Sequence, residues 1–181
     1  MRRKTFDAIL TSAGALLTVA LLISGSILLW GATFASSEVH NQLASQKIFF
    51  PPNNSPAIKA PEFAAMHQYA GEQLLTGAQA EVYADHFIAN HLKEIGGGKT
   101  YAQLSTESRA QPNNAQLAAE VNIVFKGETL RGLLLESYGF WMMGQIALTA
   151  SIAAYALAAL SLLLTVLGIL HLRRVSPTAQ L

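Results

Sequence analysis

The fold of this chain follows first from residues 8–37, which read AILTSAGALLTVALLISGSILLWGATFASS. These 30 residues contain no Asp, Glu, Lys or Arg. As an α-helix the stretch would be roughly 45 Å long at about 1.5 Å per residue, which exceeds the hydrocarbon core of a bilayer at about 30 Å. We therefore expect a membrane-spanning helix over residues 8–36.

A second stretch of the same kind lies near the other end of the chain. Residues 137–172 read SYGFWMMGQIALTASIAAYALAALSLLLTVLGILHL and also lack those four residue types, over 36 residues. A charged side chain at mid-span costs about 2.5–3.5 kcal/mol on insertion scales, and neither stretch carries one. We expect the second span over residues 137–172, and small residues such as Ala150, Ala154 and Ala158 let it pack on the first span or on a partner.

Lys and Arg beside the spans predict their orientation. Arg2, Arg3 and Lys4 precede the first span, Arg173 and Arg174 follow the second, and residues 38–136 carry ten acids against seven bases. The positive-inside bias then places residues 1–7 and 173–181 in the cytoplasm and residues 37–136 outside. Aromatic residues suited to a membrane interface lie at the outer end of each span: Trp30, Phe34, Tyr138, Phe140 and Trp141.

A cleaved signal peptide is the alternative interpretation of the first span. Arg2 to Lys4 would form its basic region, and Thr33-Phe34-Ala35 a poor cleavage site. Signal sequences have an apolar region of only about 7–15 residues, however, and this stretch is far longer. The length therefore favours a retained span.

The region between the spans shows helix signals and almost no strand signals. Thr76 with Gln79, and Thr100 with Gln103, match the capping box that opens a helix. Apolar residues recur at helical spacing over residues 80–95, and Gly96-Gly97-Gly98 is suited to stop that helix. A further helix is expected to begin at Pro61, after the prolines at 51–52 have ended the helix of the first span.

A last, long helix is expected from Ala115 into the second span. Gly127 and Gly132 are its weak points, each costing about 1 kcal/mol relative to alanine, and a break there would act as a hinge. The expected fold class is therefore all-α: a transmembrane helical hairpin with a small extracytoplasmic helical domain between the two spans.

Composition and motifs argue against catalysis and nucleic-acid binding. The net charge is only +1, and the absence of cysteine excludes disulfides, thiolate catalysis, cysteine-ligated zinc and iron–sulfur clusters. Gly96 to Thr100 lacks the glycine that a phosphate loop needs five positions before Gly98, where Lys93 stands, and it follows a helix. We expect no enzyme, no catalytic residue, no cofactor and no metal site.

Six residues are candidates for contact with a ligand or a partner. Tyr83, Phe87 and His91 lie on one apolar stripe, and His67 lies on another, so the two histidines are expected to be buried and hydrogen-bonded. A metal or proton-responsive site on this histidine pair is the less favoured alternative. Phe49 and Phe50 form an apolar loop for which three roles are open: it covers the helices, which is the favoured role, it contacts a partner, or it dips into the membrane interface.

Two segments carry a resemblance to known proteins. Gly96-Gly97-Gly98-Lys99-Thr100-Tyr101-Ala102-Gln103-Leu104-Ser105 and Phe125-Lys126-Gly127-Glu128-Thr129-Leu130-Arg131-Gly132-Leu133-Leu134 resemble a group of small two-span membrane proteins from actinobacteria. The resemblance covers most of the chain. It implies a bacterial plasma membrane and an outer domain that faces the cell envelope, and it implies no activity, cofactor or functional residue.

Three functions follow as hypotheses. The first is a non-enzymatic accessory or scaffold protein, a subunit or assembly partner of a larger membrane or envelope complex, in contact with the lipid bilayer and with other membrane proteins or itself. The second is a sensing module whose stripe with Tyr83 encloses a lipid or quinone-like ligand, unless Phe63, Met66 and Leu117 fill that space. The third is a pore of several copies, for which the spans carry too few polar residues.

Overall fold

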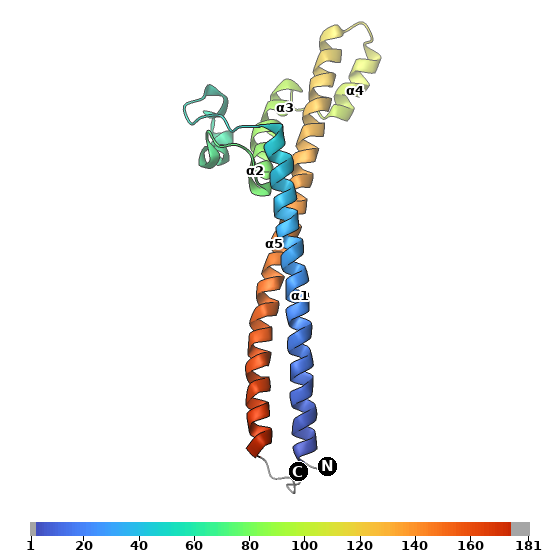
Figure 1. The fold of residues 1–181 in the computed structure, drawn as a ribbon. Coiled ribbons are helices and arrows are strands. Elements are labelled where there is room, and N and C mark those ends of the chain that lie inside the picture. Colours follow the sequence, from blue (N-terminus) through green and yellow to red (C-terminus); the bar gives the residue numbers. More distant parts are fainter. Residues whose placement is uncertain (1–2, 175–181) are drawn as a thin grey trace. The chain divides into compact units, whose positions relative to one another are not determined.

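The computed structural model describes residues 3–174, and every regular element in that range is a helix (Figure 1). Two long helices, α1 (Arg3–Gln46) and α5 (Ala115–Arg174), stand at the two ends of the chain. Between them come short elements: η1 (Pro56–Ile58), η2 (Pro61–Tyr69), α2 (Gly77–Val82), η3 (Tyr83–Ile88), α3 (Ala89–Ile95) and α4 (Tyr101–Ala110). The expected all-α class is confirmed. Of the predicted cytoplasmic ends, residues 1–2 and 175–181 lie outside the described residues.

The chain divides into two compact units. Met1–Phe34 and Gly144–Leu181 form the first, which we call the paired-helix unit, and Ala35–Met143 form the second, the mixed-helix unit. Helices α1 and α5 each contribute residues to both units.

Both long helices are long and apolar enough to cross a membrane, judged by length and composition. Within the most apolar 18-residue window, only 11% of α1 and 17% of α5 is buried inside the protein. The core helix of a globular domain would be mostly buried. These two windows are instead mostly uncovered by the rest of the protein.

Small residues form the contact between α1 and α5 in the paired-helix unit. A Cβ added at Gly14 would lie 2.7 Å from Thr165 Oγ1, and one at Gly168 would lie 2.6 Å from Thr11 Oγ1. At Gly25 it would meet the ring of Tyr155 at 3.2 Å. Glycine therefore lets the two backbones approach at three levels along the pair.

Hydroxyl groups bridge the same seam. Thr18 Oγ1 donates to Ser161 Oγ at 3.0 Å, and Ser161 in turn donates to the Gly14 carbonyl oxygen at 3.0 Å. Ser151 donates to the Gly25 carbonyl oxygen at 2.8 Å. Thr18, Ser151 and Ser161 are buried, so their polar atoms are satisfied between the two helices.

Large apolar residues fill the mixed-helix unit. Its main core joins Val39 and Leu43 of α1, and Leu134 of α5, to residues of the short elements: Phe50, Ile58, Phe63, Met66, Leu74, Ala80, Ala84, Ile88 and Leu92. A second, smaller core joins Leu104 of α4 to Leu117 and Val124 of α5. Burial of these side chains is the main term that holds the unit together, since the chain has no cysteine.

The predicted helix starts and stops are confirmed. Gln79 N donates to Thr76 Oγ1 at 3.2 Å and Gln103 N to Thr100 Oγ1 at 3.3 Å, and both capping boxes are complete. Helix α3 ends at Ile95, and the next glycines include Gly97 and Gly98 with φ of 58° and 79°. Glycine adopts this left-handed backbone without a steric cost, so the run ends the helix as expected.

Two details differ from the expectations. The segment from Pro61 forms the 3₁₀ helix η2, and the helix over residues 77–95 contains the π-helical turn η3 between α2 and α3. The long helix expected from Ala115 into the second span is confirmed, because α5 runs without interruption from Ala115 to Arg174, and its weak points at Gly127 and Gly132 do not break it. A Cβ at Gly127 would clash with Leu92 Cδ2, so this glycine allows α5 to pack closely against α3.

Candidate functional site

A row of aromatic rings joins four of the six predicted contact residues in the mixed-helix unit. The ring of Phe50 lies between Tyr69 and Tyr83, with a centroid distance of 5.3 Å to each. From Tyr83 the row continues to Phe87 at 4.8 Å and then to His91 at 4.4 Å. Ring contacts at these distances add to the stability that burial alone supplies.

The spacing of the helix residues explains the row. Tyr83, Phe87 and His91 are four residues apart, which places them on one helix face through η3 and α3. His91 Nδ1 lies 2.7 Å from the Phe87 carbonyl oxygen. A carbonyl oxygen can only accept, so His91 carries its proton on Nδ1 in this contact.

Phe63 of η2 occupies the space beside the row. Its ring centroid is 5.4 Å from His91 and 6.3 Å from Phe87, and Met66 is fully buried in the same core. Leu117, the third residue expected to fill this space, belongs to the second core instead. Protein side chains thus pack where the ligand hypothesis needs a cavity.

His67 does not join His91. It is exposed, and its Nδ1 lies 2.9 Å from Asn53 Oδ1, so the expected burial of this histidine is wrong. The cause is the 3₁₀ geometry of η2, which has three residues per turn. Phe63, Met66 and Tyr69 therefore share the inner face, and His67 points elsewhere.

The Phe49–Phe50 loop separates into one inner and one outer ring. Phe50 is 2% exposed and Phe49 is 56% exposed. The local backbone is extended and pairs with a neighbouring segment: Phe50 N donates to the Glu72 carbonyl oxygen at 2.8 Å, beside an isolated bridge between Phe49 and Gln73. Successive side chains of extended backbone point to opposite sides, so one ring enters the core and the other faces out.

Burial also changes the acid–base chemistry of the row. Desolvation raises the pKa of the Tyr83 hydroxyl above its ordinary value of 10.0. The phenol therefore stays neutral at physiological pH. A neutral donor in an aromatic row is suited to packing and to a hydrogen bond, and it is a poor nucleophile.

An ion pair that the sequence did not indicate joins η3 to α5. Arg131 Nη2 donates to Asp85 Oδ1 at 2.8 Å, and Arg131 Nη1 lies 3.6 Å from Glu128 Oε2. The hydrogen bond to Asp85 raises the pKa of the Arg131 guanidinium. Arg131 Nε is buried and makes no hydrogen bond within the described residues. The partners are 46 residues apart in the sequence, so no local sequence pattern predicts that they pair.

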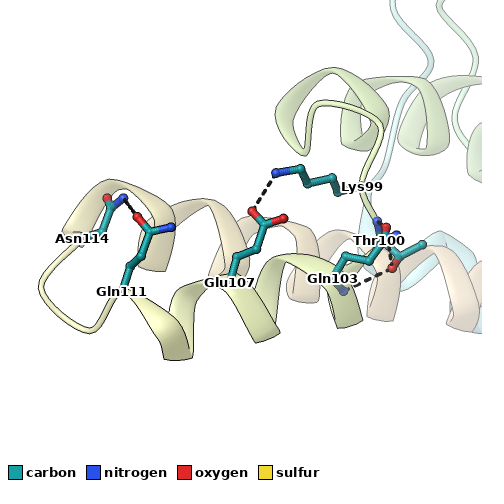
Figure 2. A network of polar contacts seen from close by, with 6 residues as sticks. All are labelled: Lys99, Thr100, Gln103, Glu107, Gln111 and Asn114. Carbon is teal, nitrogen blue, oxygen red and sulfur yellow. Dashed lines mark hydrogen bonds and ion pairs between the residues drawn. The ribbon is translucent and has the colours of Figure 1, made fainter.

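A shallow groove of about 180 Å³ lies beside this ion pair, between α3, the glycine loop and α5. Its walls are Ala89, Leu92, Lys93, Gly98, Lys99, Thr100, Val124 and Glu128. Figure 2 shows that the Lys99 ammonium is directed to Glu107, at 2.6 Å, while Thr100 caps α4 through Gln103. The Gly98 amide donates to the Lys93 carbonyl oxygen at 2.8 Å, so the loop uses this amide to end a helix.

These contacts describe packing and ion pairing, and they include no nucleophile beside a base. Among residues 3–174, no group of three or more His, Asp or Glu side chains converges as metal ligands would. Comparison of the chain with protein-family models, with curated proteins and with solved structures gives no match. The functional conclusion therefore depends on the geometry of the two units alone.

Proposed function

We propose that this chain is a two-span membrane protein that acts as a non-enzymatic accessory or scaffold subunit of a larger membrane or envelope complex. Residues 8–36 and 137–172 would cross the bacterial plasma membrane, and both termini would be cytoplasmic. Residues 37–136 would form the extracytoplasmic helical domain, which contacts another membrane protein or a second copy.

The observation that carries the membrane part of this proposal is the distribution of polar and apolar groups in the paired-helix unit. Buried hydroxyls such as those of Thr18, Ser151 and Ser161 bond inside the seam. Large aliphatic residues face outward instead, for example Leu16, which is 72% exposed, and Leu160. Lipid offers no hydrogen bond, so satisfied inner hydroxyls and an apolar outer surface suit a bilayer.

The same seam limits where a partner can bind. The small residues that let helices approach are used between α1 and α5, and lipid can cover the large residues outside them. Partner contact is therefore expected in the mixed-helix unit. Ile123, Leu130 and Leu133 are exposed there on α5, at intervals of seven and three residues that place them on one face, and we call them the α5 strip.

Neither alternative function gains support from a specific observation. Phe63 packs against Phe87 and His91, where a lipid or quinone-like ligand would need space. A pore of several copies needs a polar face on the outside of a span, whereas the hydroxyls of Thr18 and Ser161 point into the seam. The accessory role remains the function that accounts for both units.

Topology can be measured directly because the chain has no cysteine of its own. Thr5→Cys and Asn54→Cys place single thiols at exposed positions of α1 and of the loop before η1. A membrane-impermeant maleimide should label Asn54→Cys in intact cells and Thr5→Cys only after permeabilisation. The reverse pattern, or labelling of both in intact cells, would contradict the proposed orientation.

The accessory role is tested by extraction in a mild detergent followed by native mass measurement. The wild-type chain should emerge in a complex heavier than the monomer, and Leu130→Glu with Leu133→Glu should release the monomer. The matched control is Ala118→Glu with Thr129→Glu, which adds the same charge at two exposed positions on a neighbouring face of α5. A wild-type chain that is monomeric under all mild conditions would remove the basis for this role.

A further inference from the structure

Basic side chains from both long helices gather at one end of the paired-helix unit. Arg3 and Lys4 begin α1, and the last turn of α5 contains His171, Arg173 and Arg174. These two ends lie side by side, because His171 Nε2 is 3.6 Å from Asp7 Oδ2. The contact between Thr11 and Gly168, one turn further in, supports the same alignment.

One acid lies among these bases. Asp7 of α1 contacts a basic side chain from each helix. Its Oδ2 is buried and lies 3.6 Å from His171 Nε2 of α5 and 4.0 Å from Arg3 Nε of α1. Lys4, Arg173 and Arg174 are exposed and form no ion pair within residues 3–174. Asp7 therefore joins the two helix ends without neutralising the cluster, and a net positive charge is left.

Apolar surface begins directly beside the charge. Phe6 and Ile9 of α1, and Leu170 and Ile169 of α5, are all exposed within about one turn of the basic residues. A freely soluble anion would use only the charged part of this surface. An anionic amphiphile would use both parts, because its phosphate meets the cations while its chains cover the aliphatic residues.

We propose that this end of the paired-helix unit binds the phosphate headgroup of anionic phospholipids, with Arg173 and Arg174 as the principal cations and Arg3, Lys4 and His171 around them. This inference depends on the proposed insertion of α1 and α5 into a bilayer, and it is independent of the accessory role. Each Lys or Arg near an anionic surface strengthens binding about fivefold, so the two exposed arginines together contribute about 25-fold.

The test uses the full chain in lipid nanodiscs that contain equal amounts of phosphatidylcholine and phosphatidylglycerol. Native mass spectrometry of the released protein counts how many lipids of each kind stay bound. The wild-type chain should retain phosphatidylglycerol in preference, and Arg173→Gln with Arg174→Gln should reduce that preference by about 25-fold. Lys47→Gln with Lys59→Gln is the matched control, since it removes the same charge from exposed positions of the mixed-helix unit and should leave the preference unchanged.

Three outcomes would overturn the inference. One is a wild-type chain that retains both lipids equally, and another is an equal loss of preference in the lysine control. The third is displacement of phosphatidylglycerol by inorganic phosphate, which would make this a site for a free anion. Failure of the chain to stay in discs of any composition would overturn the membrane proposal as well, whereas an inserted chain without lipid preference would overturn this inference only.

Discussion

The paired-helix unit turns large apolar side chains outward, whereas the mixed-helix unit buries large apolar side chains in its core. In the paired-helix unit, glycines and hydroxyls face the neighbouring helix, and residues such as Leu16 and Leu160 face outward. In the mixed-helix unit, residues such as Phe50 and Met66 are wholly inside. One chain therefore uses two different rules of packing, and the helices α1 and α5 follow both along their length.

The proposed insertion of the paired-helix unit into a bilayer would explain the difference. Water drives apolar surface inward, so a unit in water gains stability by burying its largest side chains. Lipid gives no such drive between helices, and close backbone approach with inner hydrogen bonds must hold a pair together. Stability of the mixed-helix unit should therefore depend on the volume of its buried side chains. Stability of the paired-helix unit should depend on small side chains where the two helices meet.

Removal of Phe50 tests the dependence on volume. Phe50→Ala should lower the free energy of unfolding of the mixed-helix unit by about 3–5 kcal/mol, because a fully buried aromatic ring leaves a cavity. Urea unfolding in mild detergent measures this through Trp141, made the only tryptophan by Trp30→Phe. The control is the neighbouring ring: Phe49→Ala should change the free energy by no more than about 0.5 kcal/mol. Equal costs at the two positions would show that the extended segment is oriented differently.

Two glycines of α5 test where smallness matters inside the mixed-helix unit. Gly127→Ala should destabilise it by about 1–3 kcal/mol, because the new methyl group meets Leu92. Gly132→Ala meets nothing within 4 Å, and it should stabilise the helix by about 0.5–1 kcal/mol. The same unfolding measurement reports both signs. If both substitutions proved stabilising, the close packing of Gly127 against Leu92 would be contradicted.

The half-buried phenol of Tyr83 gives the mixed-helix unit a dependence on alkaline pH. Its pKa is raised in the folded state above the ordinary 10.0, so the folded chain holds this proton more tightly than the unfolded chain. The stability that this provides is complete below pH 10 and is lost as the pH rises through the folded-state pKa, with a slope of at most about 1.4 kcal/mol per pH unit. Unfolding curves at rising pH should show this loss in the wild type and a smaller loss in Tyr83→Phe.

The smallest effect is expected in the seam of the paired-helix unit. A double-mutant cycle of Thr18→Ala and Ser161→Ala should give a coupling energy of about 0.6 kcal/mol, because hydrogen bonds between helices in lipid contribute only modestly. Unfolding by sodium dodecyl sulfate in mixed micelles is the suitable measurement. Gly25→Ala should cost more than this coupling, since a Cβ there meets the ring of Tyr155, whereas a Cβ at Gly31 meets no atom within 4 Å and Gly31→Ala should cost little.

Local patterns predicted a large part of the fold. Thr76 with Gln79 and Thr100 with Gln103 do start helices, and Gly97 and Gly98 follow the end of one. These signals can be recognised in the sequence because a capping box needs particular side chains three residues apart, and the end of a helix needs a residue with a flexible backbone. The residues of the candidate site were harder to predict from the sequence. His67 was misplaced because the apolar spacing of its segment suits both an α-helix and a 3₁₀ helix.

Residue order alone thus determines that the chain is helical, that two of its helices are long and apolar enough for a bilayer, and where most short helices start and stop. Those properties depend on charge, on apolar length and on neighbours within four residues. Contacts between distant segments were settled only in three dimensions: Arg131 with Asp85, Gly127 with Leu92, and Phe50 between Tyr69 and Tyr83. Each joins residues that no local pattern relates, so packing of whole elements had to bring them together.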